Sequence, residues 1–552
     1  MGVYTVGVDF GTLSARALLL DAQSGEELAE AVSPYAHGVM DAALPDGTPL
    51  PPQYALQDPR DYVNALRASV GEVLETSGID PRDVVGLCVD FTCCTLLSLD
   101  ENGVPLCFDP AFQTAPLAHV LLWKHHAAQP YANELTRLLA ARAPDLLAAY
   151  GGRVSGEWLF PKIMQIAREA PDVFRRTARF CEAGDWITGR LVGRAVNSAT
   201  YAGLKAFWNE RDGYPANALL HEADPALDGI VGTKISPRVD KVGSLAGRLT
   251  EAGAAMTGLS VGTAVAVPVA DAHAAMPALG IEGDGDLAVI LGTSIVHLVN
   301  CAEEKPIPGV CARVKDGVVP GRTTYEAGQS GGGDIFDWFV RTQVPARYAA
   351  EAAAHGVSVH QLLREKAGPK PAGASGLLAL DWVNGSRSPY QNGDLSGAVL
   401  GLTMTTAPED VYRAWIEATA YGTRAIIDNF EANGVPVRSV CATGGIARKD
   451  PMLMQIFADV TGRPIRVGGA SQAGARGSAI YAAAAGGVYG SVSEAIRALR
   501  VPDVGTFVPR PREQATYRVL YAAYRRLCDR FALGGDDTMR LLADLRRNAK
   551  KD

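Results

Sequence analysis

Two segments about half a chain apart share one pattern, in which an apolar strand leads through a Gly-Thr turn into a second strand. Residues 3–21 contain the turn Gly11-Thr12, and residues 287–300 contain the turn Gly292-Thr293-Ser294. Short β-branched runs that end at glycine are typical of buried strands. The recurrence predicts two related α/β halves, each built on its own sheet.

The length of the chain also requires more than one core. Single hydrophobic cores stop growing at roughly 250 to 300 residues, and this chain has 552. Further strands are predicted at residues 84–90 and 439–445, and a helix at residues 408–431. Residues 212–243 are rich in Pro, Gly and Asp and predict an irregular connection. Residues 513–547 predict one or two amphipathic helices with an Arg-rich solvated face.

Composition excludes several classes of function. The net charge of -8 argues against a nucleic-acid surface, which needs basic side chains to neutralise phosphates. The nine cysteines form no CxxC pair, which favours reduced thiols in the cytoplasm. The first residues lack the features of a signal peptide. The most apolar stretch, residues 252–281, contains Asp271 and His273 and is a poor membrane span. We therefore expect no membrane partner.

The Asp9-Phe10-Gly11-Thr12 segment places a carboxylate at a strand end, followed by a glycine that lets backbone N–H groups approach an anion. A carboxylate beside a phosphate implies Mg²⁺, with Asp9 in direct or water-mediated contact. The Gly292-Thr293-Ser294 turn offers backbone donors and hydroxyls from the other half. The alternative for each segment is an ordinary hairpin turn. The pair together favours a phosphate clamp across a cleft.

A third glycine segment, Gly444-Gly445, follows a predicted strand and precedes a helix that opens near Asp450-Pro451. This position would bring backbone close to a nucleotide at a helix N-terminus. The sequence has no GxxxxGK[ST] loop and no GxGxxG after its first strand. A Walker-type ATPase and a dinucleotide-binding fold are therefore both disfavoured.

Asp271 follows an apolar run that holds few other charges. Its functional interpretation is a general base that accepts a hydroxyl proton during phosphoryl transfer, an effect typically worth about 10² to 10⁴ in rate. The alternative is a helix N-cap, because Asp271 precedes Ala-His-Ala-Ala-Met. The two interpretations are compatible.

Several polar residues lie near apolar or aromatic neighbours, as expected of a pocket for a polyol. They are Lys205, Glu326 and the Trp123-Lys124-His125-His126 cluster. Each one alone is more often a surface residue. The two adjacent histidines have poor spacing for a metal, and the vicinal Cys93-Cys94 pair favours packing over redox chemistry.

Motifs from most of the chain together resemble the FGGY family of carbohydrate kinases, and within it the ribulokinases, in the wider group of actin-like and heat-shock ATPase folds. The segments that carry the resemblance are VGVDFGTLSARALL at residue 6, VDFTCCT at 89, LWKHHAA at 122, EAGDWITG at 182, GLKAFW at 203, DAH at 271, LGTS at 291, YEAGQSGGGDIFDW at 325, WVNGSRSP at 382 and TGGIARKDPMLMQIFADVTGRPI at 443.

The resemblance implies an α/β fold of two ribonuclease-H-like domains of the actin-like ATPase type, which flank a catalytic cleft. It implies a sugar-binding domain at residues 1–268, an ATP-binding domain at 269–505 and a helical segment at 506–552 that packs on them. The implied reaction is ATP-dependent phosphorylation of L-ribulose at the terminal hydroxyl, in L-arabinose catabolism, with D-ribulose and pentitols as further candidate substrates. A cytoplasmic homodimer is also implied.

The resemblance assigns roles to individual positions. The implied base is Asp271, and Asp9 is the implied contact to Mg²⁺. The implied sugar contacts are Cys93, Lys205, Asp271 and Glu326. The implied ATP contacts are Gly11, Thr12, Gly292, Thr293, Gln329, Gly444, Gly445 and Lys449.

Three departures from the family pattern leave the sugar open. Cys93 stands where a small residue such as Ala is usual, Leu204 stands where His is common, and residues 330–333 are unusually rich in glycine. One methylene-sized difference in a pocket is worth only roughly 1 to 3 kcal/mol. The alternatives are an FGGY kinase for another ketose or polyol, such as xylulose or glycerol, and a non-kinase ATPase of the same superfold. A pure ATPase switch has no evident need for Lys205, Asp271 and Glu326.

Overall fold

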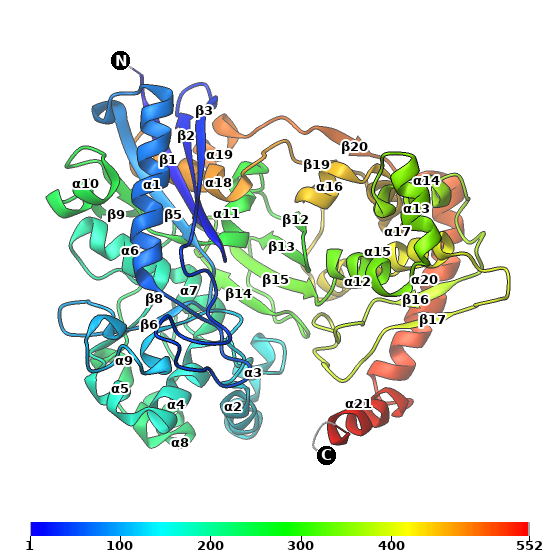
Figure 1. Cartoon of the computed structure of the whole chain (residues 1–552), viewed down its shortest axis with the longest axis horizontal. Helices are drawn as coiled ribbons and strands as arrows, with labels where there is room; N and C mark the ends of the chain where they lie inside the picture. Colours follow the sequence, from blue (N-terminus) through cyan, green and yellow to red (C-terminus); the bar gives the residue numbers. More distant parts are fainter. Residues whose placement is uncertain (1, 550–552) are drawn as a thin grey trace.

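The computed structural model describes residues 2–549 and consists of two α/β halves with a helical region at the C-terminal end (Figure 1). Each half has its own large hydrophobic core. The first core is built from residues of the N-terminal half, joined by Ala312 and Val314. The second contains residues from Leu287 onward, including side chains of the C-terminal helix. This arrangement confirms the prediction of two cores.

The first large sheet belongs to the N-terminal half and has the strand order β3-β2-β1-β5-β10-β9. Strand β1 runs antiparallel to β2 and parallel to β5, and β11 also pairs with β5 in parallel. The strand bounds are β1 Tyr4–Phe10, β2 Ser14–Asp21, β3 Glu27–Pro34, β5 Val84–Phe91, β9 Leu245–Arg248, β10 Ala264–Ala266 and β11 Val269–Ala270.

The second large sheet repeats this topology in the C-terminal half, with the order β14-β15-β13-β12-β18-β19-β20. Strand β12 runs antiparallel to β13 and parallel to β18, as β1 does to β2 and β5. The bounds are β12 Asp286–Leu291, β13 Ile295–Cys301, β14 Ala312–Lys315, β15 Thr323–Gln329, β18 Ser439–Thr443, β19 Ile465–Val467 and β20 Gly505–Phe507. The shared topology confirms the expected pair of related halves.

The N-terminal half also contains a small sheet and a set of helices; the small sheet and most of the shorter helices lie below the first large sheet in Figure 1. The small sheet has the order β4-β7-β6-β8, with β4 Leu56–Gln57, β6 Leu96–Leu99, β7 Val120–Leu121 and β8 Arg179–Glu182. The helices of this half are α1 Pro59–Ser77, α2 Gln129–Arg142, α3 Pro144–Ala149, α4 Leu159–Glu169, α5 Pro171–Arg176, α6 Ala183–Val192, α7 Ala199–Lys205, α8 Asn217–Ala223, α9 Ile230–Thr233, α10 Glu251–Thr257 and α11 Asp271–Ala278. Short 3-10 turns lie at Pro81–Asp83, Leu106–Phe108, Pro116–Ala118 and Pro225–Leu227.

The C-terminal half adds helices around the second sheet and a two-stranded ribbon, β16 Leu378–Leu380 with β17 Ala398–Leu400. Its helices are α12 Gly333–Gln343, α13 Ala346–Ala354, α14 Val359–Ala367, α15 Pro408–Ala432, α16 Gly445–Lys449, α17 Pro451–Thr461, α18 Ala473–Ala485, α19 Val492–Leu499, α20 Pro511–Ala532 and α21 Thr538–Asn548. No helix in the part of the chain that the structure describes is both long and apolar enough to cross a membrane.

Most predicted elements are present within a few residues of their expected bounds. The predicted helix at 408–431 is α15, and the predicted C-terminal helical region consists of α20 and α21. Residues 212–243 differ from the expectation, because they contain α8, a 3-10 turn and α9 among the predicted turns. The helices there are only 7 and 4 residues long, which is too short to give a clear periodic pattern in the sequence.

Helix α18 comes from the C-terminal half but packs on the first sheet, beside β1 and β5 and against α11. Glycines allow this close approach. A Cβ added at Gly7 on β1 would lie 1.8 Å from the carbonyl oxygen of Ala475, and one added at Gly477 on α18 would lie 1.6 Å from that of Ala274 on α11. Helices α11 and α18 share a third buried cluster with residues of both sheets. The two halves are therefore joined through a closely packed helix pair.

Candidate active site

Three carboxylates lie at the carboxyl ends of neighbouring parallel strands in the first sheet. Asp9 on β1 is in register with Asp90 on β5. Asp271 comes directly after β11, whose last residue, Ala270, is paired with Phe91 of β5. Because parallel strands end at the same edge, the topology gathers these side chains at one place.

Asp271 is the first residue of α11, and Ala270 occupies the N-cap position. The N-cap interpretation of Asp271 is therefore wrong. Its Oδ1 atom instead accepts a hydrogen bond from its neighbour, the Ala272 N–H, at 2.7 Å. Burial raises the pKa of Asp271 to about 7, and the nearby charges of Asp9 and Glu326 act in the same direction. A carboxylate with this pKa is suited to accept a proton near neutral pH.

Asp9 and Asp90 differ in exposure. Asp9 is partly exposed, and its Oδ2 atom lies 3.4 Å from the guanidinium of Arg16. Asp90 is fully buried; one oxygen accepts from the Ser478 hydroxyl of α18 at 2.7 Å, and Oδ1 has no partner among residues 2–549. Burial raises the pKa of Asp90 well above its ordinary value, and the charge of Asp9 adds to this shift.

Sequence reasoning missed Asp90, although the chain carries a signal for it. The same Val-Asp-Phe tripeptide contains Asp9 in the first strand and Asp90 in the second. A repeated strand-end carboxylate in two parallel neighbours indicates a shared acidic edge. Among the described residues no three His, Cys, Asp or Glu side chains form a ready-made metal site. A cation at this edge would therefore need oxygen ligands from a bound phosphate or water.

Each Gly-Thr turn is closed by a backbone hydrogen bond that its glycine donates to a residue just after it. The Gly11 N–H donates to the Ser14 carbonyl at 3.0 Å, and the Gly292 N–H donates to the Ser294 carbonyl at 3.1 Å. Gly292 and Thr293 are exposed. Thr12 is partly buried, and its hydroxyl accepts a hydrogen bond from the Trp123 indole at 3.1 Å. Trp123 thus supports the first turn.

The glycine-rich segment before α12 packs against the second turn. The Gly332 N–H donates to the Thr293 carbonyl and the Gly333 N–H donates to the Gly292 carbonyl, each at 2.9 Å. A Cβ at either glycine would lie about 3 Å from the Gly292 carbonyl oxygen. The run of glycines therefore lets the start of α12 hold this turn closely.

Gly444 brings a third segment to the same edge. Its φ angle is +102°, a conformation that favours glycine, and an added Cβ would lie 2.3 Å from the carbonyl oxygen of Leu291, the residue before the second turn. Gly445 and Lys449 follow on the exposed face of α16. The predicted nucleotide residues Gly292, Thr293, Gly444 and Gly445 are therefore close together along the ends of β12 and β18.

Gln329 lies inside the protein, and its side chain is occupied there. Its amide nitrogen donates to the carboxylate of Asp381 at 2.8 Å and to the Thr419 carbonyl at 3.0 Å. Its amide oxygen accepts from the Thr423 hydroxyl at 2.9 Å. Tyr524 of α20 donates to the other oxygen of Asp381 at 2.8 Å. The prediction that the Gln329 side chain contacts ATP is not supported by this geometry, because Gln329 instead ties β15 to the C-terminal helix.

Lys205 and Glu326 form an ion pair between the two halves. Lys205 ends α7 in the first half, Glu326 lies on β15 in the second, and their Nζ and Oε1 atoms are 3.1 Å apart. Burial alone would raise the pKa of Glu326, but Lys205 and His273 outweigh it and the pKa is lowered. Burial alone would lower the pKa of Lys205, but Glu326 holds it above its ordinary value. Both groups are therefore charged at neutral pH.

A cavity of about 340 Å³ opens beside this ion pair. The first half contributes side chains that include Glu157, Trp158 and Lys205, and the second half contributes others that include Glu326 and Arg387. The Lys205 ammonium also lies 5.9 Å from the centre of the Trp158 ring. A mixture of charged donors, acceptors and an aromatic face is typical of a pocket that binds a polyhydroxylated ligand.

Cys93 lies in a segment that two buried charges hold in place beside Lys205. The Lys162 ammonium donates to the carbonyl of Cys94 at 2.6 Å and to those of Leu121 and Leu122. Glu182 accepts from the Thr95 N–H at 2.8 Å. The thiols of Cys93 and Cys94 are near enough to affect the pKa of Lys205. Lys162 was not predicted as a site residue, because nothing in its local sequence marks a lysine as buried.

His273 is almost completely buried, and neither ring nitrogen has a hydrogen-bond partner among residues 2–549. Its Nε2 atom lies 3.6 Å from Oε2 of Glu326, which is longer than a hydrogen bond. Burial lowers the pKa of His273 to about 4, so the ring is neutral at pH 7.

His125 of the predicted histidine pair is a structural residue. It is buried, and its Nε2 atom lies 2.8 Å from the Gln165 amide oxygen. His126 is exposed and lies 3.3 Å from Glu157.

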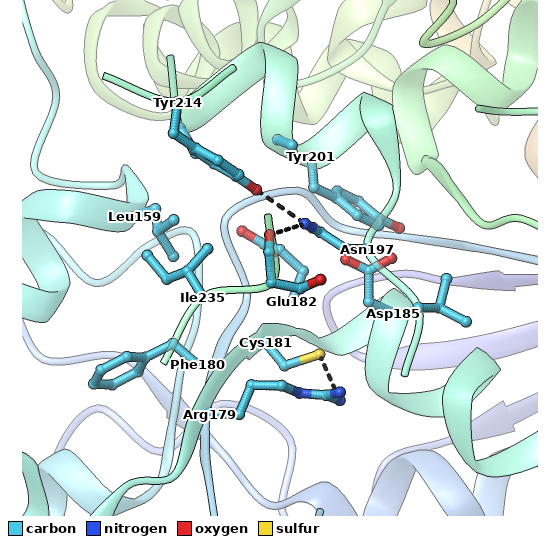
Figure 2. A pocket seen from close by; sticks show the side chains of 14 residues that line it. Leu159, Arg179, Phe180, Cys181, Glu182, Asp185, Asn197, Tyr201, Tyr214 and Ile235 are labelled. Atoms are coloured by element: carbon cyan, nitrogen blue, oxygen red, sulfur yellow. Dashed lines mark hydrogen bonds between the residues drawn. The ribbon is translucent and has the colours of Figure 1, made fainter. Parts of the chain in front are cut away.

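A second cavity, shown in Figure 2, lies among β8, α6 and α7 and measures only about 30 Å³. Its lining includes Glu182, Asp185, Asn197 and Tyr214, and the Asn197 amide donates to the Tyr214 hydroxyl at 3.0 Å. This volume holds about one water molecule. The cavity is therefore too small for a sugar or a nucleotide.

The family comparisons agree with this geometry. Residues 4–278 match the N-terminal domain and residues 287–486 the C-terminal domain of the FGGY family of carbohydrate kinases. The chain belongs to this family, and it is therefore an ATP-dependent carbohydrate kinase with the expected actin-like fold.

Individual relatives point to a narrower group. The chain is 45% identical to a ribulokinase of Geobacillus thermodenitrificans over 99% of its length and 98% of that protein. It is 46% identical to a ribulokinase of Halalkalibacterium halodurans over 98% of its length and 97% of that protein. Among solved structures, a xylulose kinase from Rhodospirillum rubrum matches with a TM-score of 0.77 at 25% identity, covering 95% of this chain and 98% of that one.

Proposed function

We propose that the protein phosphorylates L-ribulose at its terminal hydroxyl with ATP, giving ribulose 5-phosphate and ADP in L-arabinose catabolism. The observation that carries this proposal is the sequence identity of 45% and 46% to two ribulokinases over nearly the whole chain. The cavity with the Lys205–Glu326 pair supports it chemically, because both donors and acceptors face a ligand rich in hydroxyls. D-ribulose and pentitols are further candidate substrates.

In this proposal the ketose lies between the two halves. Lys205 donates to its oxygens, Glu326 accepts from its hydroxyls, and Cys93 limits the volume beside its carbon chain. Asp271 contacts the terminal hydroxyl. The predicted sugar residues come from the segment after β5, from α7, from the start of α11 and from β15, so a ligand that touches all four fixes one half relative to the other.

The nucleotide lies along the carboxyl ends of β1, β12 and β18. The two Gly-Thr turns flank the β- and γ-phosphates, with Gly11 and Thr12 on one side and Gly292 and Thr293 on the other. The N–H groups of Thr12 and Thr293 donate to the phosphates, because those of the two glycines already bond within the turns. The Gly444-Gly445 segment and Lys449 contact the remainder of ATP. The exposure of Gly292, Thr293, Gly445 and Lys449 supports this placement, since a ligand can reach them.

Asp9 fits a role in binding Mg²⁺. It is a partly exposed carboxylate at the same strand edge as Asp271, and Mg²⁺ prefers one or two carboxylates together with water and phosphate oxygens. When bound with ATP, the cation would neutralise charge on the phosphate oxygens. Asp9 would hold it directly or through water.

Asp271 acts as the general base. Its carboxylate accepts the proton of the terminal hydroxyl while that oxygen forms a bond to the γ-phosphorus and the bond to the ADP oxygen breaks. The N–H donors of the Gly-Thr turns stabilise the charge on the transferred group. Closure of the cleft excludes water, which would otherwise hydrolyse ATP. We also propose that the protein acts in the cytoplasm as a homodimer.

A substrate panel tests the proposed function. Purified protein is assayed for ADP release with L-ribulose, D-ribulose, D-xylulose, ribitol, L-arabinitol and glycerol, and the phosphosugar is identified by mass spectrometry. We expect the highest kcat/KM with L-ribulose. A higher value with xylulose or glycerol would overturn the assignment of the sugar. ATP hydrolysis that no sugar accelerates, with no phosphosugar formed, would overturn the kinase mechanism itself.

A further inference from the structure

Arg387 is a charged residue in the cavity between the halves whose guanidinium has no partner. It lines the cavity with Lys205 and Glu326 and is only partly exposed. Among residues 2–549 no hydrogen bond to its side chain and no ion pair within 4.0 Å is present. A guanidinium carries five N–H donors, and because Arg387 is partly exposed to the cavity these donors are available to a ligand that enters it.

The loop that contains Arg387 is attached to β15, the strand that carries Glu326. The N–H of the next residue, Ser388, donates to the Gly328 carbonyl at 2.9 Å. The Gln391 N–H donates to the Arg387 carbonyl at 2.8 Å, and Ser386 and Asn392 exchange two backbone hydrogen bonds of 2.9 Å. The loop is therefore closed on itself and attached to β15. The aliphatic part of Arg387 packs over Gly328, where an added Cβ would lie 3.3 Å from its Cδ.

The charges around Arg387 also leave its donors available. Burial alone would lower its pKa, but the Cys311 thiol and the carboxylates of Glu157 and Glu326 outweigh this effect. Glu326 already pairs with Lys205 at 3.1 Å, and Glu157 lies 3.3 Å from His126. Each nearby carboxylate thus has another cationic or histidine partner. In the described part of the chain, residues 2–549, no acceptor is bonded to the Arg387 guanidinium, which leaves it free to bind a ligand.

We propose that Arg387 is a substrate-binding residue that donates hydrogen bonds to the C1 hydroxyl and C2 carbonyl oxygens of the ketose. This inference rests on the proposed function. The terminal hydroxyl of the ketose must lie at Asp271, which does not line the cavity with Arg387. Glu326 lines the cavity and is near enough to Asp271 for its charge to raise the pKa of Asp271. The far end of the sugar chain, where the ketone lies, then reaches Arg387.

The arrangement gives Arg387 a defined part in specificity. Two neighbouring oxygens on C1 and C2 match the fork of a guanidinium, which binds paired acceptors in fixed geometry. A site built to bond polar groups discriminates against analogues that lack them, because its own donors are then left unpaired. Arg387 would therefore select sugars with oxygens at both carbons, whereas Asp271 acts on the other end.

The test combines a variant with a modified substrate. Arg387→Met keeps the unbranched stem of the side chain and removes every donor, and Arg387→Lys keeps the charge without the fork. Arg137→Met, on the exposed face of α2, is the matched control. Each protein is assayed with L-ribulose and with 1-deoxy-L-ribulose, and ketose binding without ATP is measured by calorimetry. Thermal melting verifies that each variant is folded.

We expect Arg387→Met to raise the KM and Kd for L-ribulose at least tenfold and to leave the KM for ATP within twofold. Wild type should lose at least tenfold in kcat/KM when the C1 hydroxyl is removed, and Arg387→Met should lose less than threefold. Arg387→Lys should fall between the two, and Arg137→Met should equal wild type. An unchanged KM for L-ribulose in Arg387→Met would overturn the inference. It would also be overturned if removal of the C1 hydroxyl lowered kcat/KM equally in wild type and in Arg387→Met.

The two proposals fail in different ways. If wild type does not phosphorylate L-ribulose but turns over another ketose, the proposed sugar is wrong. The role of Arg387 is then decided by the same assays of wild type and variants with that ketose and its 1-deoxy form. If wild type acts only on polyols without a ketone, the inference about Arg387 is overturned too. If L-ribulose is the best substrate and Arg387→Met is normal, only the inference fails.

Discussion

The Lys205 ammonium and the Glu326 carboxylate meet at 3.1 Å across the boundary between the two halves of the protein. Both side chains are mostly buried, at 11% and 15% exposure. Each therefore depends on the other for compensation of its charge, and a substitution at one leaves the other unpaired.

This dependence predicts non-additive effects in a double-mutant cycle. Lys205→Met and Glu326→Gln should each raise the KM for the ketose by roughly 30-fold, since truncating one partner of a buried pair costs about 2 kcal/mol or more. The double variant loses both contacts to the sugar but leaves no unpaired charge, so its loss should be clearly smaller than the product of the two single losses. Steady-state kinetics with ketose and ATP varied separately measure the cycle. If the increases in KM of the two single variants multiply to give the increase in the double variant, the two residues act independently.

Asp271→Asn should lower kcat by about 10² to 10⁴, the range expected for loss of a general base. The amide keeps the size of the side chain, so the Kd for the ketose, measured by calorimetry, should change less than threefold. Near-normal turnover in a folded Asp271→Asn protein would rule out Asp271 as the base.

The pH dependence of activity should follow the raised pKa of Asp271, about 7. Below this pH the carboxyl is protonated and cannot accept the hydroxyl proton. The value of kcat/KM should therefore rise with pH up to about 7 and then level off. A profile measured from pH 5.5 to 9 tests this, and a flat profile across that range, as the ordinary Asp pKa of about 4 would give, would contradict it.

The same shift predicts a change in stability. A folded-state pKa above the unfolded value means that ionised Asp271 opposes folding, an effect absent below about pH 4 and complete above about pH 7. Asp271→Asn removes the charge and should raise the free energy of unfolding at pH 8 by about 1 to 2 kcal/mol. At pH 4 the variant and wild type should melt alike. Equal melting temperatures at both values of pH would show that the ionised carboxylate carries no penalty.

Helix packing gives a prediction with an internal control. Gly477→Ala should destabilise the protein by several kcal/mol, because the new Cβ would lie 1.6 Å from the Ala274 carbonyl oxygen and force α11 and α18 apart. Gly71→Ala in α1 meets nothing within 4 Å and is exposed. It should stabilise by about 0.5 to 1 kcal/mol. Chemical denaturation of both variants measures the difference, and similar effects would contradict the packing argument.

The local pattern of the sequence was sufficient for the strands and for the two halves. Runs such as residues 3–8 and 287–291 are mostly apolar because these strands are largely buried, and the Gly-Thr turns mark where they end. Asp271 was found for the same reason, since a charge after an apolar run is conspicuous. These signals depend only on neighbours in the chain.

Other features depend on contacts between distant residues. Gln329 carries the same side chain whether it faces a nucleotide or, as here, Asp381 and Thr423, and its direction is decided by α15 and α20. Arg387 lies in a polar loop that resembles any surface loop until β15 places it over the cavity. Helix α18 reads as an ordinary alanine-rich helix, and nothing local predicts that it packs on the first sheet.

The origin of α18 has a consequence for synthesis of the protein. Strands β1 and β5 are made early, but the helix that covers them begins at Ala473. While the ribosome translates the residues between, the uncovered face of the first sheet, including Gly7 and Gly86, is open to non-native contacts. The N-terminal half therefore completes its packing only after residue 485 is made, and we expect a nascent chain halted before residue 473 to be prone to aggregation.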